Sequence, residues 1–221
     1  MIIEIGRDGL INHVNRQLTN IFGSCDDVAP YIDITLQRCE KCFKVNRNAY
    51  YYDDRGVLFF SPYHSGQYSI FLYYLSNTIY LNSNKRLASV VYYLNKVLHS
   101  VDWYYEIKLP EYWGVEHPVG SVLGKAQYGS GLFVYQGCTV GGNKGKYPVM
   151  GENIILYANS TIVGDTRLGN NVLVSTGTII KDDTVPDNCI VFGQSPDLII
   201  KSKDRDYLTS MISHFWLSEQ E

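Results

Sequence analysis

Apolar residues in the first hundred positions recur at the spacing of α-helices. From Tyr68 they return at the offsets of one helical face, and a second series with the same spacing begins at Leu87. Residues 81–85 between the two series contain two asparagines and a serine, which favour a turn and a helix start. The pattern predicts a helical hairpin. Residues 7–22 and 30–45 are further helix candidates, separated by a stretch with Gly, Asp and Pro.

After about residue 120 the apolar positions change to a period of six. One unbroken column follows six-residue steps: Met150, Leu156, Ile162, Leu168, Val174 and Ile180. An earlier column has the same spacing: Val122, Tyr128, Val134 and Val140. This period is typical of a parallel β-helix, in which each six-residue unit contributes a short strand and a corner, and the columns point into a narrow prism.

The six-residue period also constrains the interior and the corners of the prism. Positions four residues after each column member should be small or branched: Ile154, Ser160, Thr166, Val172, Thr178 and Thr184. Gly, Asn and Asp should occupy corners where φ is positive or space is tight: Gly151, Gly164, Asp165, Gly169 and Asn170. The two columns are ten residues apart rather than six, which predicts a loop with four extra residues at 141–148. Such a loop is often functional, and a tolerated surface insertion is the alternative.

Charge and hydropathy exclude several classes of partner. Nineteen Lys and Arg against 22 Asp and Glu give a formal charge of -3, without a basic run that would neutralise a nucleic-acid backbone. The longest mostly apolar stretch, around 70–81, is too short to cross a bilayer, and the N-terminal residues lack the basic flank of a signal peptide. We expect a cytoplasmic protein with no nucleic-acid and no membrane partner.

Five cysteines are too few and too scattered for a disulfide scaffold: Cys25, Cys39, Cys42, Cys138 and Cys189. Cys39 and Cys42 form a lone CxxC pair without further ligands to complete a zinc site, so we expect two thiols on a helix and no metal. Cys138 follows Val134 by four residues and should point into the prism. A buried thiol is therefore favoured over an acyl-carrying nucleophile.

Several short motifs, in their order and spacing, resemble the serine acetyltransferase family of left-handed β-helix acyltransferases. FFSPYHSGQY is similar to the family's KGFHALQAY, SVDWYYE to VDIHP, EHPVGSVLG to DHATGIVVGE, QGCTVGG to QSVTLGG, and KYPVMGENI to RHPKIGEGV. The resemblance spans about residues 55–200. With the periodic patterns, it predicts an α+β fold: a helical domain over 1–100, a left-handed parallel β-helix of hexapeptide repeats over 101–203 and a C-terminal helix over 204–221.

The resemblance implies that His117 is the general base and that Asp102 is its orienting partner. Asp102 precedes His117 by fifteen residues, as the family's catalytic Asp precedes its catalytic His. An imidazole can take the proton of an alcohol as the alcohol attacks a thioester, and a carboxylate can fix the other ring nitrogen. Three hexapeptides make a coil of about eighteen residues, so this spacing can place Asp102 on the neighbouring coil. Without the resemblance, a histidine before a proline is interpreted as a surface or turn residue.

Acetyl-CoA is the donor that the resemblance implies. Its pantetheine arm is expected in a groove between neighbouring β-helices of a homotrimer, which can pair into a dimer of trimers, so an isolated monomer would be inactive. The residues that match the groove by position are Gly141, Gly142, Ala158 and Thr176. Lys201 and Lys203 are expected to meet the adenosine phosphates, and backbone N–H groups at glycine-rich corners would stabilise the thioester oxyanion.

The acceptor side departs from the family pattern. The residues implied in acceptor binding are Glu116, Lys146, Tyr147 and His64. Glu116 replaces an Asp, Lys146 and Tyr147 replace an Arg-His pair, and NRNA at 46–49 replaces RDPA. Lys attracts a carboxylate only as a point charge, without the bidentate fork of Arg. The acid of the family's RDPA stretch is absent from NRNA. The charge of an amino group on the acceptor would therefore be less well compensated.

Three functions are therefore open. The first is serine O-acetylation, which feeds cysteine biosynthesis. The second is acetylation of a sugar hydroxyl in surface-polysaccharide biosynthesis. The third is a non-catalytic β-helix scaffold, which a bulky or charged residue in place of Gly141 or Ala158 would favour; neither is present. Family members that bind the sulfhydrylase of cysteine synthesis usually end in Ile, and this chain ends in Glu221, so no sulfhydrylase complex is expected.

Overall fold

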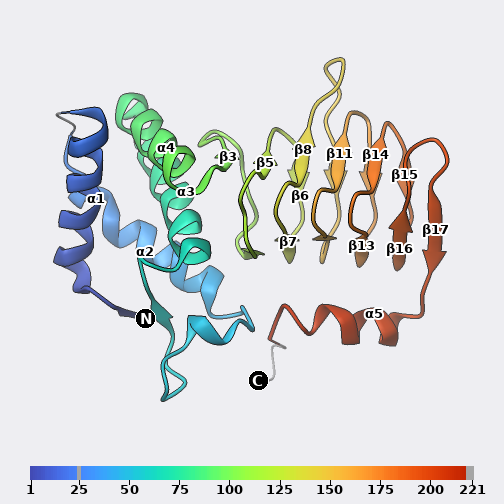
Figure 1. Ribbon diagram of the computed structural model, residues 1–221, viewed down its shortest axis with the longest axis horizontal. Helices are drawn as coiled ribbons and strands as arrows, with labels where there is room; N and C mark the ends of the chain where they lie inside the picture. Colours follow the sequence, from blue (N-terminus) through green and yellow to red (C-terminus); the bar gives the residue numbers. More distant parts are fainter. Residues whose placement is uncertain (24–25, 218–221) are drawn as a thin grey trace.

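A helical part and a β-helix lie end to end along the long axis of the molecule (Figure 1). The computed structural model describes residues 1–23 and 26–217, so Cys25 lies outside the described residues. The helical part contains four α-helices: α1 (Gly6–Phe22), α2 (Ala29–Phe43), α3 (Ser65–Leu81) and α4 (Lys85–His99). A 3-10 turn η1 (Ala49–Tyr51) and a parallel pair of short strands, β1 (Ile2–Ile3) and β2 (Phe59–Phe60), complete it. All four predicted helices are present.

The predicted hairpin of α3 and α4 is the centre of the helical part. Every residue from Gly66 to Ile79 on α3 is buried, so this helix is covered on all sides. Its buried polar groups are hydrogen-bonded, as burial requires; Asn77, for example, donates to the Tyr105 carbonyl at 2.7 Å. Asn84 begins α4 by accepting from the Leu87 N–H at 3.1 Å, the capping role that asparagine favours.

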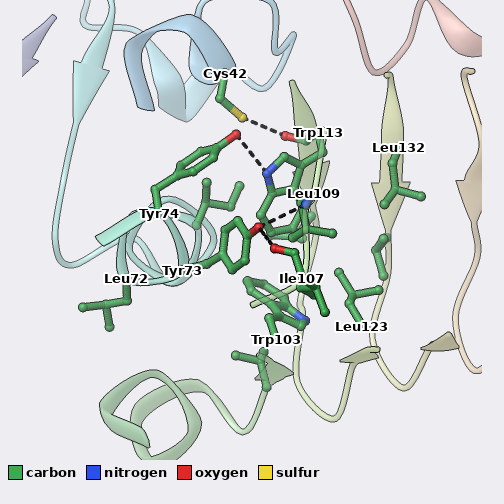
Figure 2. Packing of buried hydrophobic residues seen from close by; sticks show 14 of the residues in the cluster. Cys42, Leu72, Tyr73, Tyr74, Trp103, Ile107, Leu109, Trp113, Leu123 and Leu132 are labelled. Carbon is green, nitrogen blue, oxygen red and sulfur yellow. Dashed lines mark hydrogen bonds between the residues drawn. The ribbon is translucent and has the colours of Figure 1, made fainter. Parts of the chain in front are cut away.

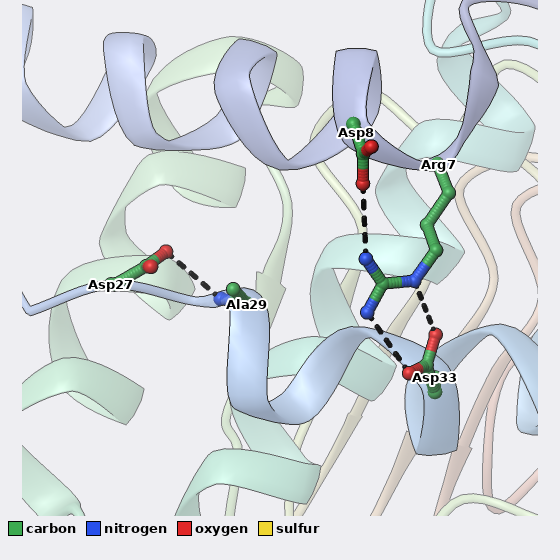
Figure 3. A network of polar contacts seen from close by, with 5 residues as sticks. All are labelled: Arg7, Asp8, Asp27, Ala29 and Asp33. Atoms are coloured by element: carbon green, nitrogen blue, oxygen red, sulfur yellow. Dashed lines mark hydrogen bonds and ion pairs between the residues drawn. The ribbon is translucent and has the colours of Figure 1, made fainter.

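Surface charges join α1 to α2 at one side of the helical part (Figure 3). The Arg7 guanidinium donates to both oxygens of Asp33, at 2.7 and 2.9 Å, and to Asp8 at 3.1 Å. The hydrogen bond from Arg7 lowers the pKa of Asp33. Asp27 accepts from the Ala29 N–H at the start of α2. Because these groups are exposed, they contribute little to stability, and the apolar face of α1 holds the two helices in place.

The second part of the chain is a three-sided parallel β-helix. Face 1 comprises β4 (Trp113–Val115), β7 (Leu132–Val134), β10 (Ile155–Leu156), β13 (Val172–Val174) and β16 (Cys189–Phe192), with β17 (Ile199–Ser202) antiparallel at its end. Face 2 comprises β3 (Asp102–Trp103), β5 (Val122–Leu123), β8 (Thr139–Gly141), β11 (Thr161–Val163) and β14 (Ile179–Lys181). Face 3 comprises β6 (Gln127–Tyr128), β9 (Val149–Met150), β12 (Arg167–Leu168) and β15 (Thr184–Val185).

The predicted apolar column fills the prism. All members of the later column are buried: Met150, Leu156, Ile162, Leu168, Val174 and Ile180. The small or branched positions are buried with one exception: Ile154, Ser160, Thr166, Val172 and Thr178. At the two ends the predictions are wrong, because Leu123 is buried instead of Val122, and Thr184 is exposed beside a buried Val185. The step from Leu123 to Tyr128 and the step from Ile180 to Val185 are five residues instead of six. Each shifts the register by one position.

One corner of the prism carries a ladder of asparagines. Asn153 donates to Asn171 at 3.0 Å, and Asn171 donates to Asn188 at 2.9 Å. All three have positive φ, between 55° and 57°, a conformation that asparagine tolerates better than most residues. Of the five corner residues predicted from composition, only Gly164 has positive φ. At Gly151 the close approach of the next coil requires a glycine, since a Cβ there would lie 2.7 Å from the Gly169 carbonyl oxygen.

Two corners hold more residues than the regular coil. Gly141 and Val149 are eight positions apart, whereas their register partners Val163 and Arg167 are four apart, which confirms the predicted four-residue insertion. Figure 1 shows this loop projecting from the edge between faces 2 and 3. The second expansion was not predicted: seven positions separate Val115 from Val122 on one coil, against five on the next. Its two extra residues lie at the corner that contains His117.

Aromatic side chains join the helical part to the first coil (Figure 2). The Tyr73 hydroxyl donates to the Ile107 carbonyl at 2.8 Å and accepts from the Leu109 N–H at 3.0 Å. The indole of Trp113 on β4 donates to the Tyr74 hydroxyl at 3.1 Å, and Cys42 on α2 donates to the Trp113 carbonyl. The buried polar atoms of this junction are therefore paired, which fixes α3 against face 1.

The C-terminal segment lies along the outside of face 1. Helix α5 (Arg205–Ile212) is shorter than the predicted helix over 204–221, of which residues 218–221, including Glu221, lie outside the described residues. It does not cap the end of the prism: Leu208, Ile212 and Trp216 pack on outward-facing residues of three face 1 strands, Phe133, Ile155 and Leu173. The apolar outer side of face 1 explains this position.

Within residues 1–23 and 26–217, no helix has the length and apolar character needed to span a membrane.

Replacing Asn171 by alanine is expected to lower the free energy of unfolding by about 3 kcal/mol, because it removes both ladder bonds and places alanine at positive φ. Urea unfolding at matched protein concentration measures this change. Asn171→Gly, which tolerates positive φ, should lose less. Equal stability of the alanine variant and the wild type would show that the ladder does not stabilise the coil.

Candidate active site

His117 occupies the expanded corner between faces 1 and 2. Its backbone has a φ of 48°, and its side chain is 77% exposed. Pro118 anchors the bulge, because its carbonyl accepts from the Ser121 N–H at 3.0 Å and the Ser121 hydroxyl at 2.7 Å. The His117 Nε2 atom lies 4.0 Å from Glu116 Oε1. The two extra residues therefore turn an imidazole outward from an otherwise regular edge.

Asp102 lies one coil below, opposite Val122 on face 2. Its carboxylate accepts from Lys96 Nζ at 2.6 Å and from the Tyr92 hydroxyl at 2.5 Å, both on α4. Burial disfavours the charged form of Asp102, but these two hydrogen bonds and the Lys96 charge outweigh it, so the pKa of Asp102 is lowered. In the described part of the single chain, Asp102 is bonded to α4 and not to His117. The pairing with His117 stays a prediction.

Two small residues, Ala158 and Thr176, lie on the same edge of the prism as His117, beyond the coil that carries Gln136 there. The Gly137 N–H donates to the Val119 carbonyl, the Asn159 N–H to the Gln136 carbonyl and the Gly177 N–H to the Ala158 carbonyl. These bonds stack the coils so that Ala158 and Thr176 lie in register above the His117 corner. Gly141, at the end of β8, is open, because a Cβ there would meet no atom within 4 Å.

The loop after β8 holds Lys146 and Tyr147 at the other edge of face 2. Tyr147 covers Gly142, where a Cβ would lie 2.7 Å from the ring, so Gly142 is less open than Gly141. Lys125 Nζ lies 4.6 Å from the centre of the Tyr147 ring, and Lys146 Nζ lies 3.9 Å from Asp165 Oδ2. A cavity of about 330 Å³ adjoins these groups. Lys146 and Tyr147 therefore flank the same face as His117, from its opposite edge.

Lys201 and Lys203 lie on or just after β17. Lys201 pairs with Ile190 in the strand register, and its Nζ is 5.5 Å from the centre of the Phe192 ring. Lys203 Nζ is 5.0 Å from the Tyr207 ring centre on α5. Both cations thus lie at the far end of face 1, several coils beyond His117.

A cavity of about 350 Å³ opens beside Glu116, the neighbour of His117. Nine residues from three parts of the chain line it: Asn46, Arg47, Asn48, Tyr50, Glu116, Phe133, Tyr135, His214 and Phe215. Burial, followed by the nearby Glu116 carboxylate, raises the pKa of Tyr135. Glu116 and the 46–49 segment were predicted from the sequence. The other five lining residues were missed, because no periodic pattern links them and only the folded chain brings them together: Tyr50, Phe133, Tyr135, His214 and Phe215.

His64 has a structural role at the start of α3. Its Nδ1 accepts from the Gln67 N–H at 3.2 Å, which satisfies a donor of the first helical turn. Burial lowers the pKa of His64, so the neutral ring that can accept this bond is favoured. The ring lies 5.8 Å from that of Tyr50, a residue of the cavity wall. His64 therefore supports the wall and does not itself line the cavity.

The described cysteines are buried thiols. Cys39 and Cys42 lie on α2 as predicted, and burial raises the pKa of Cys42 to about 11, which disfavours the thiolate. Cys138 is buried in the prism, within 3.4 Å of the Ser160 hydroxyl. Among the described residues, no group of three or more His, Cys, Asp or Glu side chains could hold a metal ion.

Sequence comparison finds relatives that are named serine acetyltransferases. The Staphylococcus epidermidis protein is 25% identical over 147 residues, covering 64% of this chain and 68% of the relative. The Synechococcus elongatus protein is 30% identical over 115 residues, covering 50% of this chain and 47% of the relative. No protein-family model matches the chain.

Comparison with solved structures finds the same group of proteins. The serine acetyltransferase of Neisseria gonorrhoeae superposes with a TM-score of 0.69 at 20% identity, over 92% of this chain and 82% of the other. A serine acetyltransferase solved in complex with CoA gives 0.65 at 18% identity, over 89% and 85% of the two chains. The predicted fold class, helices followed by a left-handed parallel β-helix, is confirmed. Sequence relatives and fold thus agree, and the resemblance of this chain to the serine acetyltransferase family is confirmed.

Proposed function

We propose that the protein is an acetyl-CoA-dependent O-acetyltransferase of the serine acetyltransferase type, with His117 as the general base. The observation that carries this proposal is the expanded corner, which exposes the imidazole on the edge where Ala158 and Thr176 lie in register. His117 takes the proton of the acceptor hydroxyl as its oxygen bonds to the acetyl carbon. The carbon–sulfur bond then breaks, and the proton passes from His117 to the CoA thiolate.

The edge beyond His117 suits the donor. An extended pantetheine arm needs close approach to backbone groups; Ala158 and Thr176 are small at this edge, and Gly141 is open at the opposite edge of face 2. A solved serine acetyltransferase of the same fold is described in complex with CoA. Lys201 and Lys203, on and just after the strand that ends face 1, would supply positive charge for the adenosine phosphates. The sequence shows no bulky substitution that would favour a non-catalytic scaffold.

The proposed site requires more than one copy of the chain. His117 and the loop with Lys146 and Tyr147 stand at opposite edges of face 2, so one chain alone does not bring them together. The outer side of face 1 is already covered by α5 and Trp216. In a homotrimer, or a dimer of trimers, the loop of one copy would reach the His117 corner of the next. This arrangement also gives the groove for the donor two walls.

Two acceptors fit the proposal. A related enzyme of the same fold is described in complex with serine, and Glu116 and Lys146 keep the charges that an amino acid needs. Serine acetylation would place the protein in cysteine biosynthesis. The alternative is a sugar hydroxyl, which the replacement of the acidic RDPA stretch by NRNA at 46–49 favours. The cytoplasmic location and the absence of a sulfhydrylase complex stay predictions.

We propose that the predicted domains contribute different parts of the site. Residues 101–203 would hold the base and the donor groove. Residues 1–100 and 204–221 would supply walls of the acceptor site, which the cavity beside Glu116 suggests.

Asp102 is proposed as the orienting partner of His117 in the assembled enzyme. That role needs an ionised carboxylate, and the hydrogen bonds from Lys96 and Tyr92 favour the ionised form. An ionised Asp102 would stabilise the imidazolium that forms during proton transfer.

Release of free thiol from acetyl-CoA tests the proposed reaction. With the wild-type protein, L-serine or a sugar from a panel of monosaccharides and nucleotide sugars should support release. His117→Ala should lower kcat at least about a hundredfold, the usual contribution of a general base. His13→Gln, on α1, serves as the matched histidine control and should leave the rate unchanged. Undiminished release by His117→Ala would exclude the base role, and no release with any acceptor would contradict the proposed activity.

Replacing Lys96 by methionine is expected to raise the pKa of Asp102, because burial remains while a hydrogen bond and a positive charge are lost. A pH titration of the Asp102 carboxyl carbon by NMR, assigned with Asp102→Asn, measures this shift. The lowered pKa stabilises the folded state above the unfolded carboxyl pKa of about 4, and this stabilisation is lost as the pH falls through the folded value. Lys85→Met, elsewhere on α4, is the control. An unchanged pKa in Lys96→Met would contradict the assignment.

A further inference from the structure

We propose that the cavity beside Glu116 is the acceptor site, that His214 and Phe215 form one of its walls, and that it takes a pyranose sugar rather than a free amino acid. This inference rests on the proposed acetyltransferase function, since it names the acceptor of the same reaction. Its starting point is position: Glu116 lines the cavity and is the residue directly before His117. The Glu116 carboxylate, 4.0 Å from the Nε2 atom of His117, connects this end of the cavity with the proposed base.

The wall formed by the C-terminal segment is fixed by backbone pairing. The Arg47 N–H donates to the Phe215 carbonyl at 3.0 Å, and the Leu217 N–H donates to the Val45 carbonyl at 2.8 Å. Figure 1 shows this segment returning from α5 to the stretch of chain that follows α2. The Phe215 ring lies 4.6 Å from that of Phe133 on β7. The C-terminal segment thus bridges the helical part and face 1 at the cavity.

Aromatic rings make up a large share of the cavity lining. Four of the nine lining residues are Phe or Tyr: Tyr50, Phe133, Tyr135 and Phe215. Tyr50 is 74% exposed, so its ring is not needed to fill the core. The C–H groups on one face of a pyranose pack on such rings, while its hydroxyls need hydrogen-bonding groups in the plane of the sugar. Side chains of the second kind are also present at Asn48, Glu116 and His214.

The charged residues of the lining differ from the family pattern. The lining contains one carboxylate, Glu116, and the position that carries an acid in the family's RDPA stretch is occupied here by Arg47. An ammonium group would therefore have one carboxylate partner, Glu116, instead of the two acids of the family pattern. A sugar hydroxyl carries no charge and needs no such compensation. The volume, about 350 Å³, lies within the range of small-molecule sites.

Steady-state kinetics on the full-length protein test the acceptor class. Acetyl-CoA is offered with L-serine, with the methyl pyranosides of glucose, galactose, mannose and N-acetylglucosamine, and with the UDP derivatives of glucose and N-acetylglucosamine. Thiol release should require one of the sugars and should not occur with L-serine. Phe215→Ala should raise KM for that sugar about tenfold, the value of one aromatic contact, with KM for acetyl-CoA unchanged.

Three further variants separate loss of the wall from loss of the fold. Phe215→Trp keeps an aromatic ring and should restore KM for the sugar. His214→Ala removes an exposed lining side chain without touching the apolar packing, and should raise the same KM several-fold. Tyr93→Ala removes an aromatic side chain on α4 that is 54% exposed and outside the cavity, and should change neither KM.

The outcomes distinguish this inference from the proposed function. Release with L-serine and with none of the sugars would overturn the pyranose assignment and leave the acetyltransferase standing. Sugar-dependent release with the same KM in Phe215→Ala and His214→Ala would overturn the C-terminal wall. No release with any of these acceptors would overturn both proposals.

Discussion

The hydrogen-bonded register between successive coils is the constraint on which the rest of this structure depends. Each coil stacks on the next through parallel backbone pairing, and its apolar column fills a prism with little free space. An extra residue cannot be taken up inside such a coil without breaking the pairing, so it must leave at a corner. Both expansions of the regular coil obey this rule, and both carry residues of the proposed site: His117 at one, Lys146 and Tyr147 at the other.

The rigid prism sets the placement of the proposed chemistry. A bulge of two residues between fixed strands holds His117 outward at a positive φ, with Pro118 bonded to Ser121 behind it. Beyond Gln136, the small residues Ala158 and Thr176 lie on the same edge and leave space for the proposed donor along the prism. Asp102, in contrast, belongs to the junction with the helical part, where Lys96 and Tyr92 bind its carboxylate. The base and its proposed partner are thus held by different parts of the fold.

The proposed acceptor side is built from segments that are distant in sequence. The stretch after α2, the corner before His117 and the C-terminal segment meet around one cavity. The polar and aromatic junction at Tyr73, Tyr74 and Trp113 fixes the helical part against the first coil, so the cavity has a defined shape. Its walls differ from the family pattern at the 46–49 segment and at Glu116, which replaces an Asp. Both departures lie on the proposed acceptor side.

The sequence alone determined the features that follow from short-range periodicity. A 3.6-residue period gave the helices, a six-residue period gave the prism and its inserted loop, and the spacing of Asp102 and His117 placed them on adjacent coils. Register at the ends was mispredicted at Val122 and Thr184, because a five-residue step at each end shifts the register by one position. Only the tertiary structure decided that Asp102 bonds to α4 and that Phe215 lines a cavity with Tyr50 and Tyr135. These contacts join segments far apart in the chain, and no local pattern encodes which of them will meet.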